Sequence, residues 1–222
     1  MILLLDNSVS MANIRMTQLN SSIPMLKSTL MKLSEDENVD LKLRIIAFSD
    51  EAVWKVGTVE AGVDISEVVW QDLDVVGSTS TPKAIREANK ALRTQYLGRH
   101  ALQPVVILVT DGYCNPSEHN DYAAAIEKMK QRLSGNTGKE KVTRIAIGVE
   151  DYNKEELIEF ASEGFISDIC QPLVFEIDKA INLGKVINWV TLTSLYSSIT
   201  NADEGIIDLG DPDWGDEVIS NF

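Results

Sequence analysis

Two continuous apolar runs in the chain are each followed by an aspartate. The first, residues 2–5 (ILLL), stops at Asp6, and the second, residues 105–109 (VVILV), stops before Thr110 and Asp111. Apolar runs without alternation are typical of strands that are buried on both faces of a parallel sheet. We therefore predict two central strands, each with an aspartate at its carboxyl end.

The period of the apolar residues changes repeatedly along the rest of the chain. From Met16 to Leu33 they recur three or four positions apart, which predicts a helix over 14–33 that Pro24 should bend or break. Further helices are predicted over 82–92, 122–133, 154–161 and 179–197, and further strands over 41–48, 53–59, 142–149 and 173–177. This alternation predicts an α/β fold: a doubly wound, mostly parallel central sheet with helices on both faces.

Composition and charge narrow the class of protein. The 222 residues are 44% hydrophobic and 24% charged, which is typical of a globular protein. The net charge of −14 disfavours nucleic acids and anionic membrane surfaces as partners, because both are bound by clustered Lys and Arg. No apolar run at the start is long enough for a signal sequence or a membrane span, and the distant Cys114 and Cys170 suit a reducing compartment. We expect a cytoplasmic protein.

The acidic residues are concentrated at the end of the chain. Residues 201–222 contain seven acidic side chains and no Lys or Arg, so they carry half of the net charge. We expect residues 1–200 to form one domain and 201–222 to form an acidic C-terminal tail. Trp214 stands alone among acids in DPDWGD. The tail is a docking peptide, a plain solubilising segment or a last turn folded back on the domain.

Three predicted loops are rich in oxygen ligands. A DxSxS segment at 6–10 follows the first strand, GSTST at 77–81 precedes a helix, and TDG at 110–112 follows the second strand. With no thiolate or imidazole among them, two carboxylates and three hydroxyls suit a hard cation such as Mg²⁺ or Mn²⁺. Such a weakly charged set would leave the ion electrophilic, so that an Asp or Glu of a partner protein could complete its coordination.

The order of these segments resembles that of the von Willebrand factor A (VWA) domain and its metal-ion-dependent adhesion site, over roughly residues 1–198. The resemblance implies that the hydroxyls bind the metal directly and the aspartates directly or through water. We call these residues the five predicted ligands: Asp6, Ser8, Ser10, Thr79 and Asp111. Val9 departs from the pattern, because many members of the family have glycine at this position.

Within the family, the segments LLLDNSVSM, GSTSTPKAI and VILVTDG are most similar to the intracellular, tellurium-resistance-associated branch. This similarity implies a bacterial stress-resistance or defence system with kinase-like or phosphatase-like proteins as partners. The function expected is that of an adaptor that binds a partner protein through a Mg²⁺-dependent site, without enzymatic activity.

Two other functions stay open. One is a structural subunit with a vestigial metal site. The other is a Mg²⁺-dependent phosphatase of the haloacid-dehalogenase type, whose first motif is also an aspartate after a strand. Ser8 stands where such enzymes usually have a second aspartate as general acid–base. A nucleotide-binding protein is disfavoured, because neither GxxxxGK[ST] nor GxGxxG occurs.

Several of these residues also have a purely structural interpretation. Ser8 and Ser10 could cap the following helix. Thr81 could be a sixth oxygen donor, but it is expected to cap the next helix. Ser80 is expected to face solvent. Cys114, next to the third loop, is expected to fill space and not to act as a nucleophile.

Overall fold

The computed structural model describes residues 1–97, 102–133, 142–166 and 168–200. The proposed tail therefore lies outside the described residues, as does Trp214. The strands are β1 (Ile2–Asp6), β2 (Lys42–Phe48), β3 (Ala52–Val56), β4 (Val63–Asp64), β5 (Val105–Thr110), β6 (Thr143–Val149), β7 (Glu163–Ile166), β8 (Ile169–Pro172) and β9 (Val174–Ile177). The α-helices are α1 (Ile14–Glu37), α2 (Thr81–Ala91), α3 (His119–Leu133), α4 (Lys154–Phe160) and α5 (Leu183–Thr200).

The central sheet has the strand order β3-β2-β1-β5-β6-β9, with β4 paired to β2. Neighbours from β2 to β9 run parallel, and β3 folds back on β2 as an antiparallel hairpin. Every residue of β1 and β5 is buried, as the two apolar runs predicted. Because these strands run the same way, the carboxyl ends of β1, β5 and β6 meet at one edge of the sheet.

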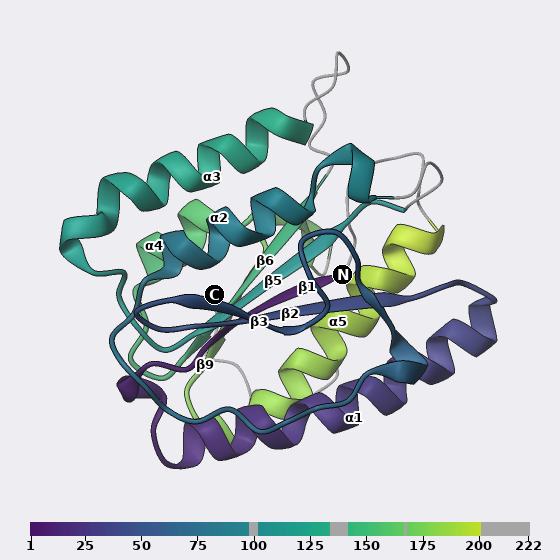
Figure 1. The fold of residues 1–222 in the computed structure, drawn as a ribbon, viewed down its shortest axis with the longest axis horizontal. Coiled ribbons are helices and arrows are strands. Elements are labelled where there is room, and N and C mark those ends of the chain that lie inside the picture. Colours follow the sequence, from purple (N-terminus) through teal and green to yellow (C-terminus); the bar gives the residue numbers. More distant parts are fainter. Residues whose placement is uncertain (98–101, 134–141, 167, 201–222) are drawn as a thin grey trace.

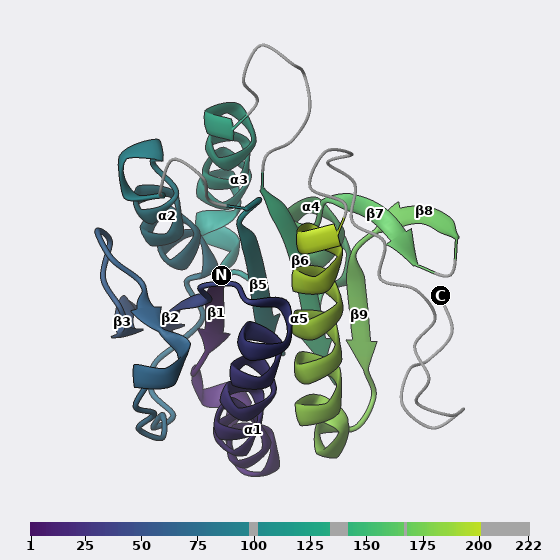
Figure 2. The same ribbon diagram turned by 90° about the vertical axis from the view of Figure 1, so that its right-hand side faces the viewer.

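Helices cover both faces of this sheet, which confirms the predicted fold class. α1 and α5 lie on one face, and α2, α3 and α4 lie on the other (Figures 1 and 2). β1 contributes to both hydrophobic cores, since Leu3 and Leu5 pack on the α1 side while Ile2 and Leu4 pack on the α2 side. The alternation of side chains along a strand produces this division.

Helix α1 is longer than predicted, and it continues through Pro24. Pro24 was expected to bend or break the helix, and the structure excludes a break. Proline inside a helix costs about 3 kcal/mol. Leu19 and Ile23 before the proline and Leu26 and Leu30 after it are all buried in the same core, and each such side chain contributes about 1.5–3 kcal/mol. This burial on both sides offsets the cost of Pro24.

Two features of the fold were not predicted. β7 and β8 form a separate antiparallel pair, and the two-residue β4 adds to the edge of β2. All three strands are too short to give a clear alternating pattern. Within the described ranges, none of the helices has the length and apolar character needed to cross a membrane.

Candidate metal centre

The first predicted loop begins where β1 ends. Asp6, the last residue of β1, is fully buried, and its Oδ1 accepts a hydrogen bond of 2.8 Å from the backbone N–H of Ser8. The hydroxyl oxygens of Ser8 and Ser10 lie 2.9 Å apart. The Ser8 side chain makes no capping hydrogen bond to the 3₁₀ turn Val9–Met11 that follows it. The interpretation of Ser8 as a helix cap is therefore wrong.

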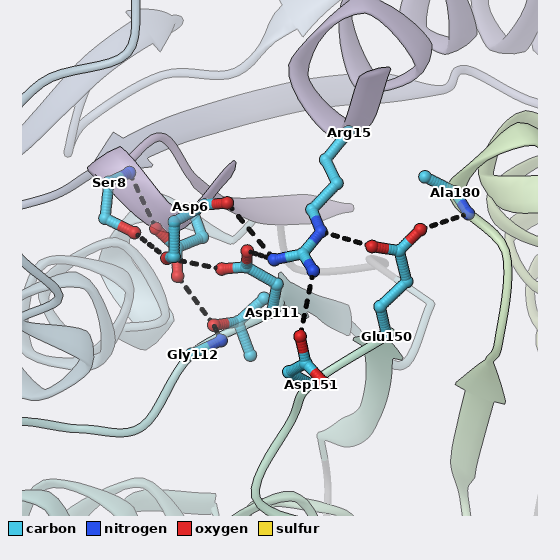
Figure 3. Close-up of polar contacts among 10 residues, drawn as sticks. Asp6, Ser8, Arg15, Asp111, Gly112, Glu150, Asp151 and Ala180 are labelled. Atoms are coloured by element: carbon cyan, nitrogen blue, oxygen red, sulfur yellow. Dashed lines mark hydrogen bonds and ion pairs between the residues drawn. The ribbon is translucent and has the colours of Figure 1, made fainter. Parts of the chain in front are cut away.

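The end of β5 connects directly to this loop. The hydroxyl of Thr110 donates a 2.6 Å hydrogen bond to Oδ2 of Asp6 and accepts one of 3.1 Å from the backbone N–H of Gly112. The hydroxyl of Ser10 donates to Oδ1 of Asp111 over 2.7 Å. Two polar contacts thus join the loops after the central strands and bring both predicted aspartates to one place (Figure 3).

The loop 77–81 completes the hollow above these residues. Gly77 has a φ of +67°, which favours glycine, and its carbonyl accepts a 3.0 Å hydrogen bond from the backbone N–H of Val9. A side chain on Gly112 would lie 3.1 Å from the hydroxyl of Thr79 and 3.6 Å from Oδ2 of Asp6, so both groups border the same point. Ser8, Ser10 and Thr79 are among the residues that line a hollow of about 370 Å³. The structure brings all five predicted ligands together.

Burial dominates the electrostatics of Asp6. It raises the pKa of this carboxyl from 3.8 to about 6, against hydrogen bonds from Thr110 and Ser8 that lower it, and the charge of Asp111 raises it further. The hydrogen-bond donors to Asp6 are neutral, and in the described part of the chain no ion pair reaches it. A buried carboxylate without a counter-charge is costly, so a cation would be stabilising here.

The donor set fits a hard divalent cation. The five predicted ligands offer carboxylate and hydroxyl oxygens, which Mg²⁺ and Mn²⁺ prefer. Among the described residues, no group of three or more His, Cys, Asp or Glu side chains could hold a metal ion. A cation at this edge of the sheet would therefore depend on the serine and threonine hydroxyls as well as on the two carboxylates.

Arg15 is part of this site and was not predicted. It is the second residue of α1, and its guanidinium contacts three carboxylates (Figure 3). Nη1 forms a short ion pair with Oδ2 of Asp111 and donates a 3.1 Å hydrogen bond to the carbonyl of Ser10. Nε lies 2.6 Å from Oε2 of Glu150, and Nη2 lies 3.2 Å from Oδ2 of Asp151. Arg15 thus joins the end of β5 to the end of β6.

Glu150 extends these contacts toward α5. It has a φ of 58°, in the left-handed region, directly after β6. Its second carboxylate oxygen accepts a 3.0 Å hydrogen bond from the backbone N–H of Ala180. Although burial alone would raise the pKa of Glu150, the Ala180 N–H and the Arg15 guanidinium together lower it. Glu150 is therefore held as an anion beside Arg15.

The second loop differs from the prediction at two hydroxyls. Ser80 is only 4% exposed and donates a 2.6 Å hydrogen bond to Glu118, so the expectation that it faces solvent is wrong. It also occupies the N-cap position of α2, although its side chain makes no capping bond, and Thr81 is the first residue of the helix. Thr81 is thus not the cap. The Ser80 hydroxyl thus ties the loop to Glu118, and Thr81 is buried in the first turn of α2.

Cys114 is buried, and this burial, together with the nearby charges of Glu156, Glu118 and Asp121, raises the pKa of its thiol from 9.0 to about 12. Three pKa units lower the thiolate fraction by about a thousandfold.

We expect iodoacetamide to alkylate the exposed Cys170 of the native protein and to spare Cys114, as read by peptide mass spectrometry. In urea, both cysteines should react. Rapid native labelling of Cys114 would contradict its space-filling role.

Comparison with known proteins gives the family and the fold. A sequence model of the von Willebrand factor type A domain matches residues 1–188. Among curated proteins, no sequence matches the chain. The structure is similar to a von Willebrand factor type A protein from Catenulispora acidiphila, with a TM-score of 0.61, 18% identity, and coverage of 86% of this chain and 41% of that one.

The structure is also similar to proximal thread matrix protein 1 from the mussel byssus. One structure of that protein gives a TM-score of 0.55 at 21% identity, and another, with a zinc-occupied MIDAS motif, gives 0.52 at 22%. Each comparison covers 86% of this chain and 44% of the mussel protein. The chain thus spans less than half the length of these relatives, and at such identities the likeness concerns the fold.

Proposed function

The chain belongs to the von Willebrand factor type A domain family, and on this premise we propose that it is a protein-interaction module that binds a partner through a divalent cation. The five predicted ligands would hold the ion, and an Asp or Glu of the partner protein would complete its coordination. Members of this family are typically interaction or adhesion modules. The native ion in this proposal is Mg²⁺ or Mn²⁺.

One observation carries the proposal. The carboxylates of Asp6 and Asp111 come from neighbouring parallel strands and converge with three hydroxyls at one edge, and Asp6 is buried among neutral hydrogen-bond donors. An ion held largely by neutral oxygens keeps a strong attraction for a further anion. The zinc-occupied MIDAS motif of the mussel protein supports a divalent cation at the corresponding place in this fold.

The rim of the hollow suits a protein partner. Val9 and Tyr113 both line it and are 62% and 61% exposed. Tyrosine is enriched at protein interfaces, and both side chains offer apolar contact area beside the polar centre. The acidic residue of the partner would thus be flanked by apolar contacts with these two side chains.

Calorimetric titration with Mg²⁺, Mn²⁺ and Zn²⁺ tests the proposal, followed by partner capture with and without EDTA. We expect saturable binding of one ion per chain, and its loss in Asp6→Ala. Capture of the partner should fall at least about tenfold in EDTA and in Asp6→Ala, because each good charged contact is worth on the order of 1.5–3 kcal/mol. Equal capture under all conditions would exclude metal-mediated binding.

A second candidate is a structural subunit with a vestigial metal site. The ion pair between Arg15 and Asp111 favours it, because a guanidinium already neutralises one of the predicted ligands. The same titration separates the two functions, since a vestigial site would show neither binding heat nor a change in melting temperature with any of the three ions.

We extend the proposal to the biological setting on the strength of the three motif segments. Their similarity to the tellurium-resistance-associated branch supports a cytoplasmic role in bacterial stress resistance or defence, with kinase-like or phosphatase-like partners. We propose no enzymatic activity, because Ser8 binds Ser10 and stands where a haloacid-dehalogenase phosphatase has its general acid–base. In this proposal residues 1–200 form the domain, and the acidic residues 201–222 follow it.

A further inference from the structure

We propose that Arg15 is an internal competitor of the divalent cation: its guanidinium and the metal alternate on Asp111, and Arg15 withdraws to Glu150 and Asp151 when the site loads. The inference rests on the proposed metal site and concerns its regulation. Arg15 would be a positioning residue that sets how much of the protein is ready to bind the ion.

The contacts of Asp111 define the competition. Its side chain is fully buried, with Oδ1 bound to the Ser10 hydroxyl and Oδ2 to the Arg15 guanidinium. The same guanidinium also donates to the carbonyl of Ser10. A metal ion shared by Ser10 and Asp111 would therefore lie beside a unit positive charge. Two cations at hydrogen-bond distances on one carboxylate repel each other strongly in a buried site.

Arg15 has other anionic partners that it can keep when it releases Asp111. A guanidinium has five N–H donors in a planar fork, so it can release one anion while it keeps others. Arg15 binds Glu150 through Nε and Asp151 through Nη2, and neither of these nitrogens contacts Asp111. The side chain of Glu150 is 28% exposed and is anchored by the Ala180 N–H. Release of Asp111 would thus leave Arg15 paired to two carboxylates.

The competition lowers the apparent metal affinity in a calculable way. If only a fraction of the molecules has Arg15 away from Asp111, the apparent dissociation constant equals the intrinsic one divided by that fraction. A pair that is formed in about nine molecules of ten weakens binding about tenfold. Removal of the charge at residue 15 should restore the lost metal affinity and also remove the repulsion between the two cations.

The test is calorimetric titration of Mg²⁺ into the full chain as wild type, Arg15→Gln and Arg86→Gln. Arg86→Gln is the matched control, because it removes the same charge. Arg86 forms an exposed 2.9 Å ion pair with Asp121 between α2 and α3. We expect Arg15→Gln to bind Mg²⁺ at least about tenfold more tightly than wild type. Arg86→Gln should bind it as wild type does.

Melting curves provide a second readout. In EDTA, Arg15→Gln should melt below wild type, because Asp111 is then buried without its counter-charge, and saturating Mg²⁺ should stabilise it more than it stabilises wild type. If Arg15→Gln does not fold in EDTA, Arg15→Lys serves instead. A single ammonium cannot hold three carboxylates in the same geometry, and we expect a few-fold tighter binding from it.

Each outcome is decisive. Tighter binding by the Arg15 variant alone supports the competition. Equal or weaker binding by that variant, with wild-type binding intact, overturns the role of Arg15 and leaves the proposed metal site standing. Absence of binding heat and of metal stabilisation in all three proteins overturns both proposals.

Discussion

Replacement of Asp6 by asparagine is expected to stabilise the metal-free protein and, under the proposed function, to abolish stabilisation by Mg²⁺. The pKa of Asp6 is raised from 3.8 to about 6 by burial, so the folded state favours the protonated form. A shift of about two units corresponds to roughly 3 kcal/mol lost when Asp6 ionises. Asparagine is neutral and still accepts the hydrogen bond from Ser8 N–H, so a gain of about 1–3 kcal/mol is expected at about pH 7.5 in EDTA.

The stability difference between Asp6→Asn and wild type is expected to depend on pH. The pKa of Asp6 is higher in the folded state than in the unfolded state, so protonation of Asp6 stabilises the fold. This stabilisation is complete below about pH 4 and is lost as pH rises through about 6. The advantage of Asp6→Asn should therefore shrink steadily between pH 7.5 and 4, as measured by urea denaturation. Asp111→Asn is the matched control. Since Asp111 is paired with Arg15, its loss should destabilise the protein. An Asp6→Asn variant less stable than wild type at pH 7.5 would contradict the unpaired burial of Asp6.

Replacement of Gly148 by valine is expected to destabilise the protein by about 3 kcal/mol. Extra methyl groups in a filled core force neighbouring side chains or the backbone out of place. A Cβ on Gly148 would lie 2.6 Å from Cδ1 of Leu157 and 2.6 Å from Cγ of Tyr152. Tyr152 is held by a hydrogen bond to Glu176, and Leu157 is buried. Leu157 is enclosed and Tyr152 is tied to Glu176, so one of these side chains, or β6 or α4, would have to shift. Thermal and urea denaturation measure the effect.

Gly184→Ala is the matched control for Gly148→Val. It lies in α5, where a Cβ would meet the Cβ of Ser22 at 3.5 Å, an ordinary contact. Alanine has the higher helix propensity, so the change should be neutral or stabilising by up to about 1 kcal/mol. A Gly148→Val variant that is as stable as Gly184→Ala would show that Tyr152 is free to move.

The sheet was predictable because its central strands carry an unambiguous pattern. The buried runs of β1 and β5 are apolar throughout, and the stripe from Met16 to Leu33 has a single period. β7 and β8 were not predictable in this way. Their residues Glu163–Ile166 and Ile169–Pro172 are short and mixed in burial, so tertiary contacts decide their conformation.

Four of the five predicted ligands, Asp6, Ser8, Ser10 and Asp111, follow the ends of β1 and β5, and residues after strand ends of a parallel sheet meet at one edge. Thr79 lies in the loop before α2 and was predicted from the resemblance to the VWA domain. Arg15 was missed because apolar periodicity describes only the buried stripe of a helix. A signal was present, however. A cation in the first turn of a helix opposes the helix dipole, and an anionic partner nearby would compensate for this cost. Glu150 and Asp151 follow β6, and the strand-end rule applied to that strand identifies them as the partners.

The contacts that assemble the site join residues far apart in sequence. The hydrogen bonds from Thr110 to Asp6 and from Ser10 to Asp111 span 104 and 101 positions. During synthesis, the loop after β1 therefore emerges long before the strand that completes it. Metal binding would then require that β5 has been made and has paired with β1. Under the proposed function, cation affinity would then report finished folding, and a truncated or misfolded chain would lack the site that the partner binds.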